Sequence, residues 1–286
     1  MKNILTIDVE DYFQVENFKK RVKFSDWDKY EMRVQANTEK ILSILGESDT
    51  KATFFVLGWV AEKLPHLVKK ISDAGHEIAS HGYGHDLIYE RTPEEFKDDL
   101  LRSRTILEDI IKRRVSGYRA PSWSVTKKSL WAIDILMEER YSYDSSVFPI
   151  YSDHGGLASA KRFPHRIYNH KNSIWELPIS TVKIFGLNVP FSGGGYFRLL
   201  PYRFIKRSIE KINREGNPVI IYLHPWEFDA EQPRIMSDPI SGFRHYVNIE
   251  KTERKLHMLL EGFDFIKIDD FLTDRKEHSH EVVGQV

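Results

Sequence analysis

Short apolar stretches alternate with longer amphipathic segments along most of this chain, and that alternation limits the folds it can adopt. Parallel strands joined by helices require this order, because each helical crossover returns the chain to the same end of the sheet. The sequence therefore predicts an α/β sheet or barrel. The expected strands lie within residues 3–8, 51–58, 76–85, 115–125, 141–147, 173–179, 218–228 and 264–272, and the expected helices within 33–47, 61–75, 92–113, 126–140, 201–216 and 249–262.

Helix 92–113 has the clearest boundary signal in the chain. Thr92 is a favoured N-cap residue, Pro93 suits the first turn, and Glu95 occupies the capping-box position. By contrast, residues 12–30 are aromatic and charged without a clear period, so we expect a long loop there.

Polar side chains follow the predicted strands directly. They are, in chain order, Asp8, Glu10, Asp11, His81, His85, Arg119, Asp144 and His224. The carboxyl ends of parallel strands share one face of a sheet, and that face carries the functional site in folds of this class. We therefore expect these side chains to converge on one cleft.

Three carboxylates within the four positions of "DVED", residues 8–11, repel one another unless a positive partner lies nearby. His81 and His85 offer two imidazoles four positions apart, with glycines between them that argue against an ordinary helix. Two histidines, one carboxylate and an open position form a typical catalytic zinc site. The chain has no cysteine, so histidine and carboxylate must supply the ligands. The alternative is a pair of surface loop histidines.

Composition limits the classes of partner. Basic and acidic residues number 42 each in a chain of 286, so bulk electrostatic binding to nucleic acid or an anionic membrane is not expected. No stretch approaches the roughly 20 apolar residues of a spanning helix. The N-terminal "MKNILTIDVEDYF" lacks a signal-peptide core, so a cytoplasmic location is expected. Residues 273–286 are polar and are expected to be a disordered tail. A homo-oligomer is left open.

Five segments of the chain match, in order, the motifs of a known family. They are "TIDVED", "HGYGH", "RAPSW", "YSYDSSV" and "YLHPW". With them the chain resembles the polysaccharide deacetylase (NodB-homology) family of carbohydrate esterases, which are metal-dependent N-deacetylases. The segments "DVEDYFQVENF" and "LHPWEFD" are similar to sequences of the subgroup associated with bacterial exopolysaccharide export.

The resemblance implies a distorted seven-stranded (β/α) barrel in a single catalytic domain over residues 1–272. Its core motifs span 6–224 and a C-terminal extension covers about 228–272. It also implies a metal-dependent hydrolase, with one divalent ion, most simply zinc, that removes N-acetyl groups from amino sugars of a bacterial polysaccharide or its precursor. The alternatives are a metal-independent, allantoinase-like amidohydrolase and a carbohydrate-binding protein that has lost catalysis.

Roles follow from the resemblance by position. Asp8 matches the general base, and Arg119 matches the residue that orients this base. Asp144 matches the acid that pairs with the last histidine or with the arginine, and His224 matches the general acid. The backbone N–H of Ser122 matches half of an oxyanion hole.

His81 and His85 match the metal ligands, but the third ligand is ambiguous. The family usually has two adjacent aspartates, whereas here Val9 follows Asp8. Residue type favours Asp11 and spacing in some relatives favours Glu10, so Asp11 is preferred with Glu10 as the alternative. Trp123, Tyr196 and Trp226 are candidates for a sugar-binding platform, although aromatic residues of this kind are often part of the core.

Overall fold

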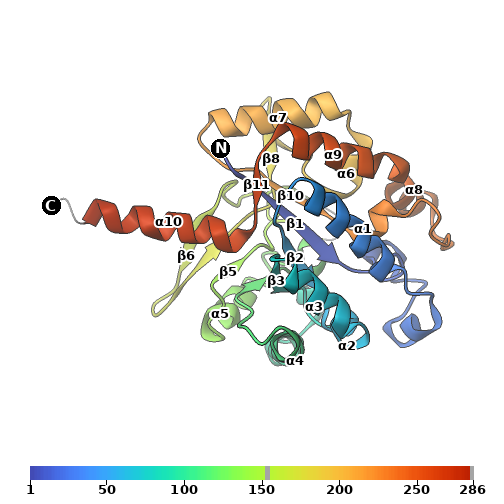
Figure 1. The fold of residues 1–286 in the computed structure, drawn as a ribbon. Coiled ribbons are helices and arrows are strands. Elements are labelled where there is room, and N and C mark those ends of the chain that lie inside the picture. Colours follow the sequence, from blue (N-terminus) through green and yellow to red (C-terminus); the bar gives the residue numbers. More distant parts are fainter. Residues whose placement is uncertain (152–154, 284–286) are drawn as a thin grey trace.

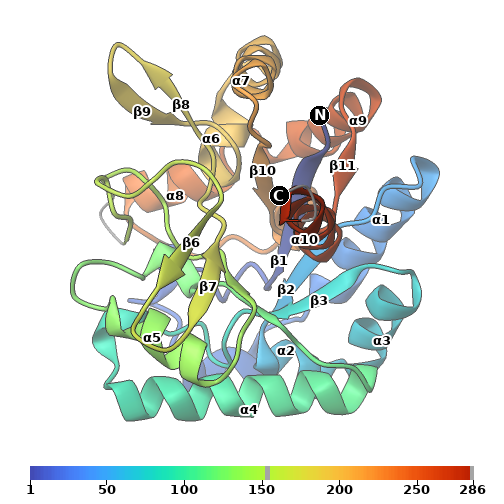
Figure 2. The same ribbon diagram turned by 90° about the vertical axis from the view of Figure 1, so that its left-hand side faces the viewer.

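A curled, mainly parallel sheet forms the centre of the computed structural model, which describes residues 1–151 and 155–283 (Figures 1 and 2). The strands run parallel in the order β10-β1-β2-β3-β4-β5-β7. Their bounds are β1 Asn3–Val9, β2 Thr53–Val56, β3 Glu77–Ser80, β4 Gly117–Tyr118, β5 Tyr143–Asp144, β7 Ser173–Glu176 and β10 Ile220–Leu223. The predicted parallel α/β architecture is therefore confirmed.

The strand count differs from the expected seven, because the sheet has nine strands in the part of the chain that the structure describes. β6 (His165–Tyr168) pairs antiparallel with β7 at one edge, and β11 (Phe265–Ile266) adds to the start of β1. Within the described residues the strand order ends at β10 and at β6, so the sheet is a half-barrel. A separate hairpin joins β8 (Thr181–Ile184) to β9 (Leu187–Pro190).

Most of the helices lie around the outside of the sheet, whereas the C-terminal helix projects away from the body of the molecule (Figures 1 and 2). Their bounds are α1 Val34–Glu47, α2 Gly58–Lys63, α3 Pro65–Asp73, α4 Pro93–Ile111, α5 Trp131–Glu138, α6 Gly194–Leu199, α7 Tyr202–Arg214, α8 Pro239–Tyr246, α9 Thr252–Gly262 and α10 Ile268–Val283. The capping box of α4 is confirmed: Glu95 N donates to Thr92 Oγ1 (3.2 Å), and Thr92 N donates to Glu95 Oε2 (2.9 Å).

Two predicted segments differ from the structure. The single helix expected over 61–75 is two helices, because Pro65 cannot continue the hydrogen-bond ladder of α2 and instead begins α3. The tail expected to be disordered from 273 is helical as far as Val283 in α10, whose first turns bury Ile268, Phe271 and Leu272; residues 284–286 lie outside the described residues. In the described part of the chain, no helix is both long and apolar enough to cross a bilayer.

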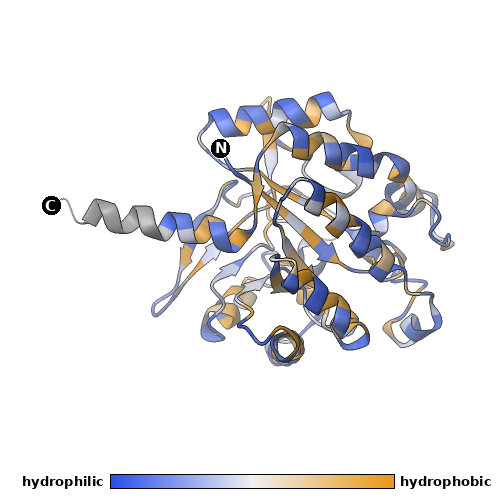
Figure 3. Ribbon diagram, viewed as in Figure 1, coloured by the Kyte–Doolittle hydropathy of each residue, from blue (hydrophilic) through white to orange (hydrophobic). Residues whose placement is uncertain are grey.

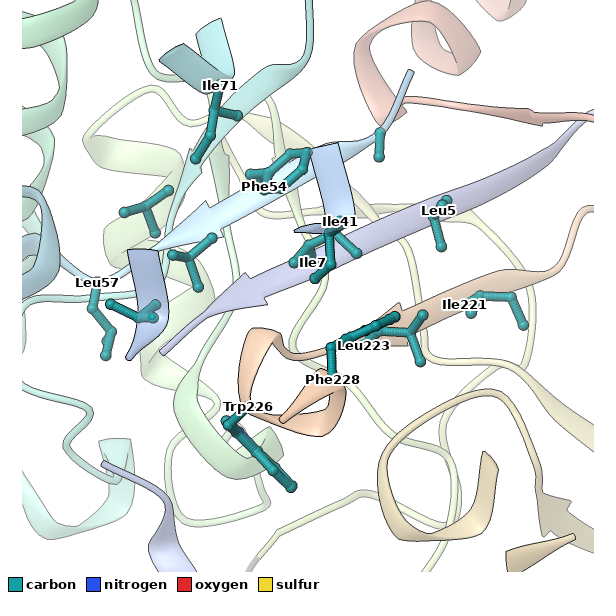
Figure 4. Packing of buried hydrophobic residues seen from close by; sticks show 14 of the residues in the cluster. Leu5, Ile7, Ile41, Phe54, Leu57, Ile71, Ile221, Leu223, Trp226 and Phe228 are labelled. Carbon is teal, nitrogen blue, oxygen red and sulfur yellow. The ribbon is translucent and has the colours of Figure 1, made fainter. Parts of the chain in front are cut away.

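Side chains of β1 alternate between two buried layers. Leu5 and Ile7 pack outward with Ile41 of α1 and with Phe54 and Leu223 of the neighbouring strands (Figure 4). The helices turn their apolar faces toward this layer and their polar faces to solvent (Figure 3). Residues at even positions of β1, which include Asp8, therefore point to the opposite side, into the curl of the sheet. Both sides of β1 are buried, which explains its continuous apolar sequence.

Candidate active site

A cavity of about 560 Å³ lies at the carboxyl ends of the parallel strands. Asp8 and Glu10 at the end of β1, His81 and His85 after β3, and His224 after β10 all line it. These five side chains are almost completely buried from bulk solvent, except His224, of which 14% remains exposed. The structure thus brings together residues that are more than 200 positions apart, as the order of strands and helices predicted.

Glu10, His81 and His85 offer one ligand atom each, and these atoms lie within 4.8 Å of one another. His85 Nε2 is 2.8 Å from Glu10 Oε2. That carboxylate oxygen is buried, and apart from the adjacent ring of His85 it has no donor in the described part of the chain. A buried carboxylate needs a positive partner, and a cation between the three groups would supply one.

The protonation states of His81 and His85 are compatible with binding of a cation between them. His81 Nδ1 is 2.8 Å from the carbonyl oxygen of Arg119, which can only accept, so Nδ1 carries the proton and Nε2 keeps its lone pair. Burial lowers the pKa of His81 to about 4, so its ring is neutral at neutral pH. Burial also favours the neutral form of His85, but the charge of Glu10 outweighs it and raises the pKa of His85. A divalent ion would take the place of that proton.

Asp11, which residue type favoured as the third ligand, lies outside this cluster. Its Oδ2 accepts from the backbone N–H groups of Arg33 (2.7 Å) and Val34 (2.9 Å), and its Oδ1 accepts from Tyr12 N (2.9 Å). The carboxylate therefore binds the N-terminus of α1, where free N–H groups favour a negative charge. Glu10, the alternative, shares the inward side of β1 with Asp8 because side chains alternate along a strand. The prediction that Asp11 is the third metal ligand is therefore wrong, because its carboxylate points away from the two histidines.

Arg119 and Asp8 form a buried ion pair. Arg119 Nη1 lies 2.6 Å from Asp8 Oδ1, and the same atom donates to Thr6 Oγ1 at 2.8 Å. Arg119 Nε donates to the carbonyl oxygen of Ser145 (3.1 Å), and its Nη2 donates to the hydroxyl of the same residue (2.9 Å). Arg119 has no exposed surface. With its donors engaged on several sides, the guanidinium holds one oxygen of Asp8 and leaves the other facing the cavity.

His224 faces Asp8 and Glu10 across the cavity. Its Nε2 lies 3.9 Å from Asp8 Oδ2 and 3.6 Å from Glu10 Oε1. Its Nδ1 lies 3.0 Å from Glu227, a residue that the sequence did not single out. Burial alone would lower the pKa of His224, but the hydrogen bond and charge of Glu227, with the carboxylates at the end of β1, raise it to about 9. The imidazole is therefore a proton donor at neutral pH.

In the described structure, Asp144 forms no hydrogen bond or ion pair with Arg119 or His224, the residues expected to be its partners, although Arg119 is near enough for its charge to lower the pKa of Asp144. β5 and β7 place it in register with Glu176, so that the two buried carboxyls are close enough to shift the pKa of one another. Asp144 Oδ1 also accepts from Ser146 Oγ (2.5 Å). Among the described residues, Asp144 Oδ2 and Glu176 Oε2 have no hydrogen-bond donor, and one proton shared between them would satisfy both. Burial raises the pKa of each group, most strongly that of Glu176, which is also close to the charge of Asp144.

This pair predicts a pH dependence of stability. A carboxyl whose pKa is raised on folding stabilises the fold fully below its unfolded pKa, and that contribution is lost as the pH rises through the folded value, at about 1.4 kcal/mol per pH unit. A Glu176→Gln variant keeps a donor for Asp144 and removes the titration. We expect its melting temperature, relative to the wild type, to rise between pH 5 and pH 8. The exposed Glu47→Gln is the control, and parallel melting curves for Glu176→Gln and wild type would contradict the shared proton.

Four further candidates line the cavity with different exposures. Ser122 and Trp123 have left-handed backbone angles (φ 51° and 57°), a strained conformation that is concentrated at functional sites. Tyr196 is 44% exposed and presents its ring at the mouth. Trp226 instead is only 5% exposed, stacks between His224 and His245, and donates from Nε1 to Glu10 Oε1 (3.1 Å). It holds the site together rather than offering a free ring face.

Glu227 and Arg198 are the functional candidates that the sequence did not reveal. Glu227 lies three positions after His224, which is the spacing of a capping box, and its side chain accepts from His224 N (2.9 Å). That spacing was a signal available in the sequence. Arg198 carried no comparable signal, because its contact with Glu227 crosses 29 positions.

Two family models match this chain. A polysaccharide deacetylase model matches residues 17–136, and a domain of unknown function (DUF3473) matches residues 145–273. His81, His85 and Arg119 lie in the first segment, and Asp8 and Glu10 precede it. His224 and Glu227 lie in the second.

Curated relatives share part of the chain. A peptidoglycan-N-acetylglucosamine deacetylase of Bacillus cereus is 35% identical over 103 residues, which cover 34% of this chain and 36% of the relative. A peptidoglycan deacetylase of Helicobacter pylori is 30% identical over 108 residues, with 38% and 36% covered. The chain thus matches about a third of the length of these relatives.

Solved structures share the fold over nearly the whole chain. A candidate polysaccharide deacetylase from Mycobacterium smegmatis aligns with a TM-score of 0.65 at 19% identity, covering 96% of this chain and 90% of that one. Puue allantoinase aligns with a TM-score of 0.62 at 16% identity, covering 93% and 87%. The fold is that of the polysaccharide deacetylases. The family model and the curated relatives show that the chain is similar to this family over part of its length.

Proposed function

We propose that this protein is a metal-dependent N-deacetylase acting on N-acetylated amino sugars of a bacterial polysaccharide. The observation that carries the proposal is the cluster of Glu10, His81 and His85 beside Asp8, with His224 Nε2 3.6 Å from Glu10 and 3.9 Å from Asp8. A bound divalent ion would polarise the amide carbonyl and lower the pKa of water in the cavity. Two histidines with one carboxylate and no cysteine are a typical zinc donor set, so zinc is the proposed ion.

The side chains around the cluster supply the proton transfers. Asp8, held by Arg119, removes a proton from the attacking water as the carbon–oxygen bond forms. Ser122 lines the cavity, and its backbone N–H would stabilise the developing oxyanion. His224 then gives its proton to the amide nitrogen, so that the carbon–nitrogen bond breaks, the amine leaves neutral and acetic acid is released, which loses its remaining acidic proton to water as acetate.

The mouth of the cavity suits a carbohydrate. Trp123 and Tyr196 line it together with exposed apolar side chains from the C-terminal segment, among them Ile240 and Phe243 of α8, which are 64% and 59% exposed. Pyranose rings have apolar faces that pack on such side chains, while the reacting acetamido group would point toward Glu10. The relatives named above act on peptidoglycan, and the sequence subgroup suggests an exopolysaccharide or its lipid-linked precursor as the substrate. A cytoplasmic location and the oligomeric state stay predictions.

Acetate release tests this function. We expect the purified protein to contain about one divalent ion per chain. It should release acetate from an N-acetylglucosamine oligosaccharide, lose this activity with a chelator and regain it with zinc. Activity that survives complete metal removal would favour the allantoinase-like amidohydrolase instead. Binding of the oligosaccharide with no acetate release from the zinc-loaded protein would favour a carbohydrate-binding protein.

A further inference from the structure

The imidazole of His224 is held by a carboxylate from its own loop. Glu227 Oε2 accepts from the backbone N of His224 (2.9 Å) and lies 3.0 Å from its Nδ1. A carboxylate in this place fixes the proton on Nδ1 and turns Nε2 toward the cavity, where Asp8 and Glu10 lie. Glu227 has no exposed surface, so its charge acts on the ring with little screening by solvent.

Arg198 anchors Glu227 from behind. Its Nε donates to Glu227 Oε1 at 2.7 Å, and it is only 1% exposed. Arg198 Nη1 donates to the carbonyl oxygens of His245 (2.5 Å) and Val247 (3.0 Å), and Nη2 donates to that of Arg244 (3.0 Å). These carbonyls lie at the carboxyl end of α8, where a cation is favoured. The donors of Arg198 are thus engaged, and Glu227 cannot turn away without leaving a buried charge unpaired.

The residue that the family resemblance assigns to this role is engaged elsewhere. Asp144 lies in register with Glu176 and accepts from Ser146, and among the described residues no hydrogen bond or ion pair joins it to His224. Glu176 lies in β7, and Ser146 follows β5. In the strand order, β4, which precedes Arg119, separates these two strands from β10, which precedes His224. The only carboxylate against Nδ1 in the described structure is that of Glu227.

We propose that Glu227, held by Arg198, is the positioning residue for the general acid His224, in place of Asp144. The contacts above give the geometry of Glu227 and His224, and the effect on catalysis rests on the proposed deacetylation. It also links the catalytic histidine to α8, whose carboxyl end binds Arg198 and whose Ile240 and Phe243 line the mouth of the cavity. Helix α8 therefore contributes to catalysis as well as to the cavity wall.

Two measurements on the zinc-loaded protein test the proposal. The first is the ring N–H signal of His224 in protein labelled with ¹⁵N-histidine, assigned by its loss in His224→Ala. In the wild type and in Asp144→Asn we expect a downfield Nδ1–H signal, because a carboxylate accepts that proton. In Glu227→Gln the signal should move upfield or exchange with water. An unchanged signal in Glu227→Gln, or its loss in Asp144→Asn, would overturn the contact.

The second measurement is kinetic, with an N-acetylglucosamine oligosaccharide as substrate. Glu227→Gln should lower kcat by about 10- to 100-fold, as for other groups that orient a functional histidine, while KM and zinc content stay close to those of the wild type. Glu231→Gln, an exposed carboxylate in the same loop, is the matched control and should keep the wild-type kcat. A wild-type kcat in Glu227→Gln with an altered ring signal would refute the positioning role. Absence of acetate release from the wild type would refute the proposed function alone, since the ring signal still decides the contact.

Discussion

A Glu10→Ala variant is expected to lose its divalent ion, whereas Asp11→Ala is expected to keep it. Glu10 supplies the carboxylate of the three-residue cluster, and removing one of three protein ligands leaves two histidines that cannot hold the ion tightly. Metal content should fall from about one ion per chain to near zero, with loss of acetate release. Metal analysis after gel filtration measures this, and His81→Ala with His85→Ala should give the same result.

Asp11→Ala serves as the matched comparison, because Glu10 and Asp11 are neighbours whose side chains point in opposite directions. Asp11 accepts three backbone N–H groups, two of them at the start of α1. Its loss leaves these donors unpaired and should lower stability by about 1–3 kcal/mol, with metal content unchanged. Loss of the ion in Asp11→Ala, in protein that circular dichroism shows to be folded, would return Asp11 to the ligand set.

An Asp8→Asn variant is expected to lose activity by about 10²- to 10⁴-fold, the usual contribution of a general base. Asparagine keeps an oxygen for Arg119, so the hydrogen bond between β1 and β4 can persist while the basic oxygen on the cavity side is lost. Asp8 is not a member of the three-residue cluster, so zinc content should remain at about one ion per chain.

Zinc content and KM serve as the controls for Asp8→Asn. A loss of kcat with retained zinc and an unchanged KM identifies a group that acts on the reacting atoms. Loss of zinc together with activity would instead show that Asp8 contributes to the ion's binding. A kcat within threefold of the wild type would show that the water is activated by another group, and the assignment of Asp8 as the base would be wrong.

Sequence alone determined the features that depend on local pattern and on chain order. Strand–helix alternation indicated parallel pairing, and parallel pairing required Asp8, His81 and His224 to lie at one end of the sheet. The start of α4 followed from Thr92 and Glu95, because a capping box is a local interaction. For the same reason, Pro65 could have shown where α2 ends, since proline acts on its own helix.

Only the tertiary structure decided which carboxylate meets which partner. Asp11 faces away from the histidines because the N-terminus of α1, 22 positions further on, needs an acceptor there. Asp144 is paired with Glu176 because β5 and β7 are neighbours in a register that no local pattern reveals. Glu227 remains against His224 because Arg198 and the end of α8 meet it in space. Sequence sets the types of donor and acceptor available, while strand order and register decide the distances between them, and electrostatic interactions depend on those distances.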